Sequence, residues 1–161
     1  MKEKMKIYLD TNIVYGYFLA KNLSVHGKAF KLPSVINFLK GQQTRFEYYV
    51  SILMKTEIMR ILVSELGLEK AVSRKMWQDF LDEINAREIK VEESLDEIYG
   101  EILMIVEETK IKKRVTNLEH LIVAKNSGFI FVTGDNEILE KCKTYHPRVM
   151  SYTELRGFEC I

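Results

Sequence analysis

Short apolar segments alternate with helical segments along most of the chain. Residues 6–9, 46–52 and 129–132 are rich in aliphatic, aromatic and β-branched side chains, a composition that predicts buried strands. Residues 88–91 alternate as a half-buried strand does, and 148–150 is a candidate for the last strand. Helices are predicted between these strands, over residues 13–20, 34–39, 54–66, 69–86, 94–109 and 116–128, with a short one after residue 135.

Residues at the helix ends support this division. Pro33 stands where a first helical turn begins, Gly67 stops the helix that starts at residue 54, and capping boxes open at Ser94 and Thr116. Strands that alternate with helices predict an α/β fold, a parallel-sheet sandwich flanked by helices on both faces. Such sheets bind ligands beyond the carboxyl ends of their strands, near a switch in strand order.

Composition narrows the class of protein. A length of 161 residues indicates one domain that spans residues 1–161. Hydrophobic residues at 47% and charged residues at 29% are typical of a folded globule, and no apolar run approaches the ~18 residues of a membrane span. Cys142 and Cys160 lack metal or redox spacing, so we interpret them as inert thiols and expect a cytoplasmic protein without a membrane partner.

The net charge of +1 is small for a protein that binds nucleic acid by bulk electrostatics. The charge is unevenly distributed, because residues 110–114 (KIKKR) form a basic run. This run could contact RNA phosphates, but a solvated loop between helices is the favoured interpretation.

Four acidic residues stand where predicted strands end or helices begin. Asp10 and Asp135 each follow a strand, and either could simply cap the next helix. Glu57 could favour a helix macrodipole and pair with Arg60. Glu119 is the fourth residue of a predicted capping box and could bond back to the first. Each acid taken singly therefore has a structural explanation.

Taken together, the four acids predict a metal site. In a parallel sheet these positions share one edge, so four carboxylates could converge on one pocket. Clustered carboxylates repel one another unless a cation balances them, and oxygen ligands suit Mg²⁺ or Mn²⁺. Such an ion activates water and neutralises charge on a phosphoryl group. Metal-assisted phosphodiester hydrolysis is the predicted reaction class.

Three short blocks resemble PIN-domain ribonucleases, in order and spacing that cover nearly the whole chain. Residues 7–12 (IYLDTN) are similar to the family's opening strand and its Asp-Thr-Asn/Ser signature. Residues 56–58 (TEI) resemble its Glu near the start of an early helix. The third block is the most specific: residues 119–124 (EHLIVA), Gly128 and 131–135 (FVTGD) follow the family's Asp-x-x-Ile-Ala-Ala…Gly…Leu-Val-Thr-x-Asp run.

This resemblance implies a metal-dependent endoribonuclease that cleaves RNA, often the toxin of a VapBC-type toxin–antitoxin pair. An antitoxin protein and a second copy of the chain are the implied partners. The quartet that holds Mg²⁺ or Mn²⁺ would be Asp10, Glu57, Glu119 and Asp135. Thr11, Asn12 and Thr133 match the family's positions that orient ligands or water, and Glu137 matches an auxiliary acid.

The chain departs from the family pattern at Glu119, which stands where Asp is commoner. His120 comes next, and since adjacent residues on a helix point about 100° apart, we interpret it as a neighbour of the site rather than a ligand. Trp77 and Phe80, spaced i and i+3, indicate core or a dimer face rather than a platform for stacking bases.

Three other classes of protein are alternatives. A haloacid-dehalogenase-type phosphatase would use Asp10 as nucleophile, but it needs a second acid where Asn12 stands. A response-regulator receiver domain needs an acidic pair after the first strand, which the sequence lacks. A catalytically silent PIN scaffold that binds RNA or a partner has no reason to keep four mutually repelling acids.

Overall fold

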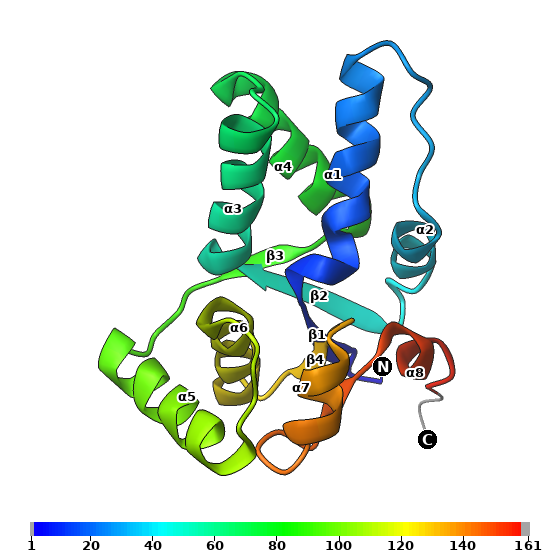
Figure 1. Ribbon diagram of the computed structural model, residues 1–161. Coiled ribbons are helices and arrows are strands. Elements are labelled where there is room, and N and C mark those ends of the chain that lie inside the picture. Colours follow the sequence, from blue (N-terminus) through cyan, green and yellow to red (C-terminus); the bar gives the residue numbers. More distant parts are fainter. Residues whose placement is uncertain (1, 159–161) are drawn as a thin grey trace.

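The computed structural model describes residues 2–158, which form a parallel sheet of five strands flanked by helices (Figure 1). The strands are β1 (Met5–Leu9), β2 (Phe46–Ser51), β3 (Arg87–Ile89), β4 (Ile130–Val132) and β5 (Val149–Met150). Their order in the sheet is β3-β2-β1-β4-β5. The chain builds outward from β1 to β3 and then returns to the other side of β1 for β4 and β5. The switch in strand order therefore lies between β1 and β4.

The central strand β1 shows how the sheet divides the core. Successive strand side chains point to opposite faces, so Ile7 and Leu9 join one hydrophobic cluster and Tyr8 joins another. The register places Tyr8 beside Phe131 and Leu9 beside Val132. Phe131 accordingly lies in the cluster of Tyr8, and the sheet separates two cores.

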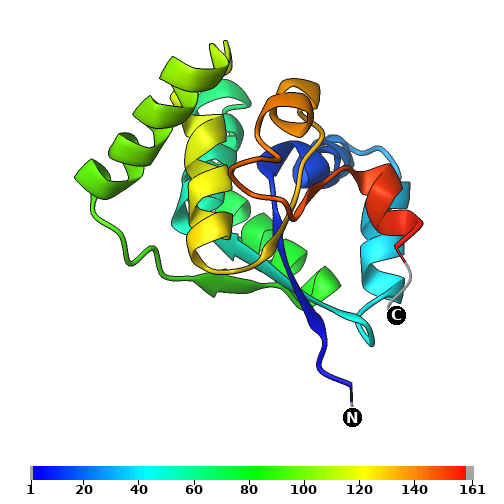
Figure 2. The ribbon, with the colours of Figure 1, turned by 90° about the horizontal axis from the view of Figure 1, so that it is seen from below.

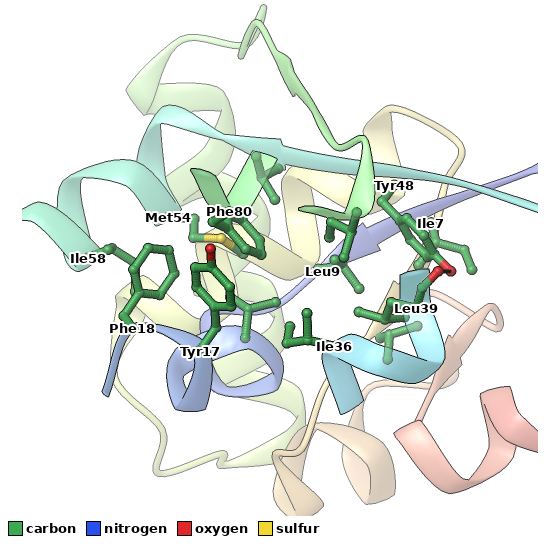
Figure 3. Close-up of a cluster of buried hydrophobic side chains, with 14 of the residues drawn as sticks. Ile7, Leu9, Tyr17, Phe18, Ile36, Leu39, Tyr48, Met54, Ile58 and Phe80 are labelled. Atoms are coloured by element: carbon green, nitrogen blue, oxygen red, sulfur yellow. Dashed lines mark hydrogen bonds between the residues drawn. The ribbon is translucent and has the colours of Figure 1, made fainter. Parts of the chain in front are cut away.

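The first core lies against helices α1 (Thr11–Val25), α2 (Ser34–Gly41), α3 (Ile52–Met59), α4 (Lys70–Ile84) and α8 (Tyr152–Arg156). Figure 3 shows Tyr17 and Phe18 of α1 packed with Phe80 of α4. The ring centroids of Phe18 and Phe80 are 5.2 Å apart. Burial of each such ring contributes about 1.5–3 kcal/mol. Trp77 and Phe80 are both buried here, which confirms that they are core residues.

The second core lies against helices α5 (Leu95–Thr109), α6 (Val115–Asn126) and α7 (Asn136–Lys141). Helix α6 lies between α5 and the sheet, as Figure 2 shows from below. Because both sides of α6 are covered, its residues 118–124 are buried without a break.

One predicted helix feature is wrong, and one predicted helix is confirmed but has an irregular second half. The capping box predicted at Thr116 does not form, because α6 already begins at Val115 and its N-cap, Arg114, makes no side-chain hydrogen bond. The helix predicted over 54–66 is regular only as far as Met59, where it continues as a π-helical segment, η1 (Arg60–Glu65). The box at Ser94 forms as predicted.

No helix in the described part of the chain is long and apolar enough to cross a membrane. Cys142 is buried and has a free thiol, as predicted, while Cys160 lies outside the described residues. Burial raises the pKa of the Cys142 thiol to about 11, and Asp135 and Glu137 add to the shift. A raised pKa keeps the Cys142 thiol protonated at neutral pH, as the interpretation of an inert thiol predicts.

Candidate active site at the carboxyl edge of the sheet

Asp10 lies at the switch point, one residue after β1. Its Oδ1 accepts a hydrogen bond of 2.8 Å from the Thr11 amide, so Asp10 does cap α1. Its Oδ2 accepts bonds from the Thr133 hydroxyl at 2.8 Å and from the Asn12 amide at 3.3 Å. Asp10 is only 3% exposed, and Oδ2 serves no capping role. The structure therefore orients this carboxylate beyond what a helix cap needs.

The surroundings of Asp10 disfavour its charge. Burial raises the pKa of Asp10 above its ordinary value, and the nearby Glu57 adds to the rise. His120, Thr133 and the Thr11 amide act in the opposite direction without cancelling it. A bound cation would stabilise the ionised form of a carboxylate in this position.

Thr133 and Asn12 join the ends of β1 and β4. The Thr133 hydroxyl donates to Asp10 and accepts from the Asp135 amide at 3.0 Å. The Asn12 side chain accepts from the Gly134 amide at 2.9 Å. A Cβ on Gly134 would lie 3.4 Å from the Asn12 Oδ1, so the absence of a side chain there eases this approach. The structure thus brings Asp10, Asn12, Thr133 and Asp135 into one hydrogen-bonded group.

Asp135 also combines a cap with a second contact. Its Oδ1 accepts from the amides of Glu137 and Ile138 and begins α7. Its Oδ2 accepts from the Asn117 amide at 3.3 Å and lies 3.6 Å from Nζ of Lys113. The side chain of Asp135 is 3% exposed and that of Lys113 is 42% exposed. Part of the basic run 110–114 therefore reaches the rim of the site.

Glu57 projects from α3 toward α1 and α6. Its Oε1 accepts a hydrogen bond of 3.3 Å from the Thr11 hydroxyl, and the same oxygen bonds to Nε2 of His120. Arg60, which the sequence offered as a partner of Glu57, instead pairs with Glu65 at 2.5 Å. Thr11 contacts both Asp10 and Glu57 and so connects the two acids.

His120, which the sequence placed beside the site and not among its ligands, contacts the site directly through Glu57. It is 1% exposed, and besides Glu57 its Nδ1 bonds to the Tyr8 hydroxyl at 2.7 Å. Neighbouring residues differ in burial on a helix that has only one covered face. Helix α6 is buried on both sides, so Glu119 and His120 both lie inside. The signal in the sequence was two polar residues within the apolar run 118–124.

Glu119 and Glu137 lie at the margins of this group. Glu119 is 8% exposed, and its Oε1 accepts from the Tyr99 hydroxyl at 2.7 Å, which raises the pKa of Tyr99. Glu137 accepts from the Lys112 amide at 2.8 Å, and this bond lowers the pKa of Glu137. The structure thus turns the Glu137 carboxylate to the basic run, while its backbone amide touches Asp135.

The side chains at this edge offer the oxygen ligands that a hard divalent ion prefers. Three of the four acids are buried, all four present carboxylate oxygens, and the pKa of Asp10 is raised. Each carboxylate is engaged by protein donors, however, and within residues 2–158 no three His, Cys, Asp or Glu side chains are placed together to hold an ion. The donors suit Mg²⁺ or Mn²⁺, and an ion would bind by replacing some of these contacts.

A separate groove lies along α3, η1 and α4. Its volume is about 690 Å³, and its walls include the apolar side chains of Met59, Val63 and Trp77. Lys55, Arg60 and Arg74 add positive charge to it. Thr56 of α3 also lines the groove, and none of the four acids is among its lining residues.

Solved structures that share this architecture include two VapBC complexes. One is the VapBC2 complex from Rickettsia felis, solved bound to a DNA fragment from its promoter; the match has a TM-score of 0.66 and 17% identity, and covers 91% of this chain and 97% of that chain. The other is VapBC-1 from nontypeable Haemophilus influenzae, with a TM-score of 0.57 and 14% identity over 92% of this chain and 99% of that chain. Neither a family model nor a curated protein matches the sequence.

The structural matches define the class of fold. The chain has a PIN-like α/β fold of the VapC type, which confirms the fold predicted from its sequence. The matches extend along nearly the whole of both chains.

Proposed function

We propose that the chain is a Mg²⁺- or Mn²⁺-dependent endoribonuclease whose active site is the acidic edge around Asp10. The observation that carries this proposal is the burial of Asp10 and Asp135 at the switch point, where donors orient oxygens that their capping roles do not use. A purely structural edge would have no reason to desolvate acids whose charges oppose one another. The VapC-type fold supports the same reading.

Asp10, Glu57, Glu119 and Asp135 would hold the ion. When bound, such an ion lowers the pKa of a water molecule and neutralises charge on the phosphoryl group under attack. The chain itself supplies the orientation: Thr133 and Asn12 fix Oδ2 of Asp10, while Thr11 reaches Glu57. Preorganised oxygens lose little freedom when they bind an ion.

Lys113 is the residue best placed to meet RNA at the rim. Its ammonium group lies 3.6 Å from Asp135 and is 42% exposed, so it can contact a phosphate beside the acidic centre. This contact would offset the repulsion between an acidic site and a polyanion. The remaining lysines of the run 110–114 are exposed and are consistent with the solvated loop favoured from sequence.

The phosphatase alternative finds no support in the side chains. Asn12, which stands where that class needs a general acid, donates to Asp10 and accepts from Gly134. An amide held in this way cannot exchange a proton with a leaving group. A silent scaffold is the alternative that experiment must separate.

Cleavage of a labelled mixed RNA pool tests the proposal. We expect the purified chain to cut RNA with Mg²⁺ or Mn²⁺, and expect EDTA or the variant Asp10→Asn to abolish cutting. Asp82→Asn, which changes an exposed acid on α4, is the matched control and should cut normally. Cutting that persists both in EDTA and in Asp10→Asn would refute the metal site.

A toxin role with an antitoxin partner is part of the same proposal, as are a cytoplasmic location and a single nuclease domain over 1–161. It is supported by the fold shared with chains solved as VapBC complexes. Expression of the wild-type chain should stop growth, expression of Asp10→Asn should not, and co-expression of the protein encoded beside it should restore growth. Growth arrest by Asp10→Asn would contradict a toxin that acts by cleavage.

A homodimer is supported by one helix face. Leu95, Tyr99, Leu103 and Val106 follow one another at i, i+4, i+8 and i+11 on α5, and all are exposed. We propose that a second copy covers this stripe. Light scattering should report a dimer for the wild type and a monomer for Leu103→Glu.

A further inference from the structure

A chain of buried polar side chains runs from β2 to Glu57, and the four-acid site does not account for it. The Tyr8 hydroxyl lies 2.7 Å from the Ser51 hydroxyl and 2.7 Å from Nδ1 of His120. Nε2 of His120 bonds to Oε1 of Glu57. Ser51 and Tyr8 are fully buried and His120 is 1% exposed, although Tyr8 belongs to the apolar second core and its ring lies against that of His120.

The directions of these hydrogen bonds follow from the capacities of the groups. An ionised Glu57 can only accept, so Nε2 of His120 donates to it. In the uncharged ring Nδ1 then accepts, and the Tyr8 hydroxyl donates to it. The oxygen of Tyr8 accepts from the Ser51 hydroxyl, whose oxygen accepts from the Leu53 amide at 3.2 Å. All four bonds point toward Glu57.

This chain of bonds ends on Glu57, which is more exposed than the other three acids. The Glu57 side chain is 30% exposed, whereas Asp10 and Asp135 are buried and capped by backbone amides. Both protein contacts of Glu57 fall on Oε1, and Oε2 accepts no hydrogen bond from the residues that the structure describes. The histidine therefore fixes one oxygen and leaves the other available.

We propose that His120 is a positioning residue: it holds Glu57 in the orientation that receives the divalent ion, and Tyr8 with Ser51 holds the imidazole in its Nε2–H tautomer. This inference rests on the proposed metal-dependent function. Ser51 also caps α3, the helix that carries Glu57, so it acts on the acid by two routes. Hydrogen bonds to ligating groups commonly change metal affinity by ~10–100-fold.

Manganese titration of metal-free protein by calorimetry tests the proposal. We expect His120→Phe to weaken Mn²⁺ binding by ~10–100-fold, because it removes the donor to Glu57 and keeps a ring in the core. His120→Gln, whose amide can donate from nearly the same place, should bind within a few-fold of the wild type. The Mn²⁺ affinity of Tyr8→Phe should lie between those of the two His120 variants, because this change keeps the imidazole but removes the hydroxyl that selects its tautomer.

Two control variants separate positioning from general loss of structure. Tyr48→Phe removes another buried hydroxyl with a 2.7 Å bond, to the Leu39 carbonyl, away from the acids. His146→Gln changes another buried histidine, which donates to the Phe129 carbonyl. Both should bind Mn²⁺ as the wild type does. If His120→Phe folds and binds as tightly as the wild type, the positioning role is refuted.

The tautomer gives a readout that needs neither metal nor activity. Nitrogen-15 spectra of the metal-free protein should show His120 with a proton on Nε2 and an accepting Nδ1, and Tyr8→Phe should bring the two tautomers toward a mixture. A wild-type Nδ1–H tautomer, or one unchanged by Tyr8→Phe, would overturn the proposed chain of bonds. A wild type with the expected tautomer that binds no Mn²⁺ would instead refute the proposed function and leave the His120–Glu57 contact intact.

Discussion

The Thr133 hydroxyl donates a hydrogen bond of 2.8 Å to Oδ2 of Asp10, although the two residues are 123 positions apart in the chain. The bond joins the carboxyl ends of β1 and β4, the two strands between which the strand order reverses. Thr133 has no exposed surface, and it also accepts from the Asp135 amide. One hydroxyl therefore couples two of the four acids.

Replacing Thr133 with valine should show how much this hydroxyl contributes to stability and to Mn²⁺ binding. Thr133→Val keeps the shape of the side chain but leaves the Asp135 amide without its acceptor and Asp10 without its shortest side-chain donor. We expect the free energy of unfolding to fall by about 1–3 kcal/mol. We also expect weaker Mn²⁺ binding, since Asp10 becomes free to rotate.

Thr109→Val is the matched control, because Thr109 donates to the Ile105 carbonyl on α5 and touches none of the four acids. It should lose stability without losing Mn²⁺ affinity. Equal loss of Mn²⁺ affinity in both variants would mean that the effect comes from stability alone.

Asp10→Asn should abolish metal binding without destabilising the metal-free protein at neutral pH. Since the folded-state pKa of Asp10 is raised above its ordinary 3.8, its contribution to stability is present below that value and is lost as pH rises through the raised value. Asparagine cannot ionise, so the variant does not lose this stability as the pH rises. Urea unfolding in EDTA should find the variant at least as stable at pH 7, with the wild type gaining on it as pH falls toward 4. A variant that is less stable at pH 7 would contradict the account.

Tyr17→Phe should stabilise the protein. Tyr17 is fully buried, and its hydroxyl has no hydrogen-bond partner among the described residues. Removing that hydroxyl relieves a desolvation cost of about 1 kcal/mol. Tyr48→Phe, which breaks the bond to the Leu39 carbonyl, should destabilise by about the same amount. Thermal melts of the two variants should therefore shift in opposite directions, and a shift of both in one direction would be contrary to this assignment.

His146 should contribute to instability in acid. Burial lowers the pKa of His146 below its ordinary 6.5, so its contribution to stability is present above 6.5 and is lost as pH falls through the lowered value. His146→Gln keeps a donor for the Phe129 carbonyl but cannot take up the proton. Unfolding curves between pH 7 and 5 should fall less steeply for the variant. Parallel slopes would exclude this role.

The sequence predicts the parts of the fold that depend on local patterns. The runs at 6–9, 46–52 and 129–132 are strands, and Asp10 and Asp135 lie at the shared edge because parallel strands end there. Both acids also cap helices, which confirms the structural interpretation, while their role as metal ligands stays a prediction. The strand predicted over 88–91 is instead Arg87–Ile89, a difference at its ends only.

The burial and pairing of several site residues depend on tertiary contacts, which local sequence patterns do not predict. Whether α6 has one covered face or two depends on α5, so the burial of His120 beside Glu119 could not be derived from spacing on one helix. Arg60 pairs with Glu65 and not with Glu57, and both residues of this pair lie in a π-helical segment that no local pattern indicated. Tyr99, the partner of Glu119, comes from a region with no diagnostic motif.

Binding of Mn²⁺ to the purified, metal-free chain tests the central claim most directly. Calorimetry should detect binding to the wild type and to Asp82→Asn, and none to Asp10→Asn. A wild type that binds no Mn²⁺, or an Asp10→Asn variant that binds it equally well, would contradict a divalent-ion site at the carboxyl edge of this sheet.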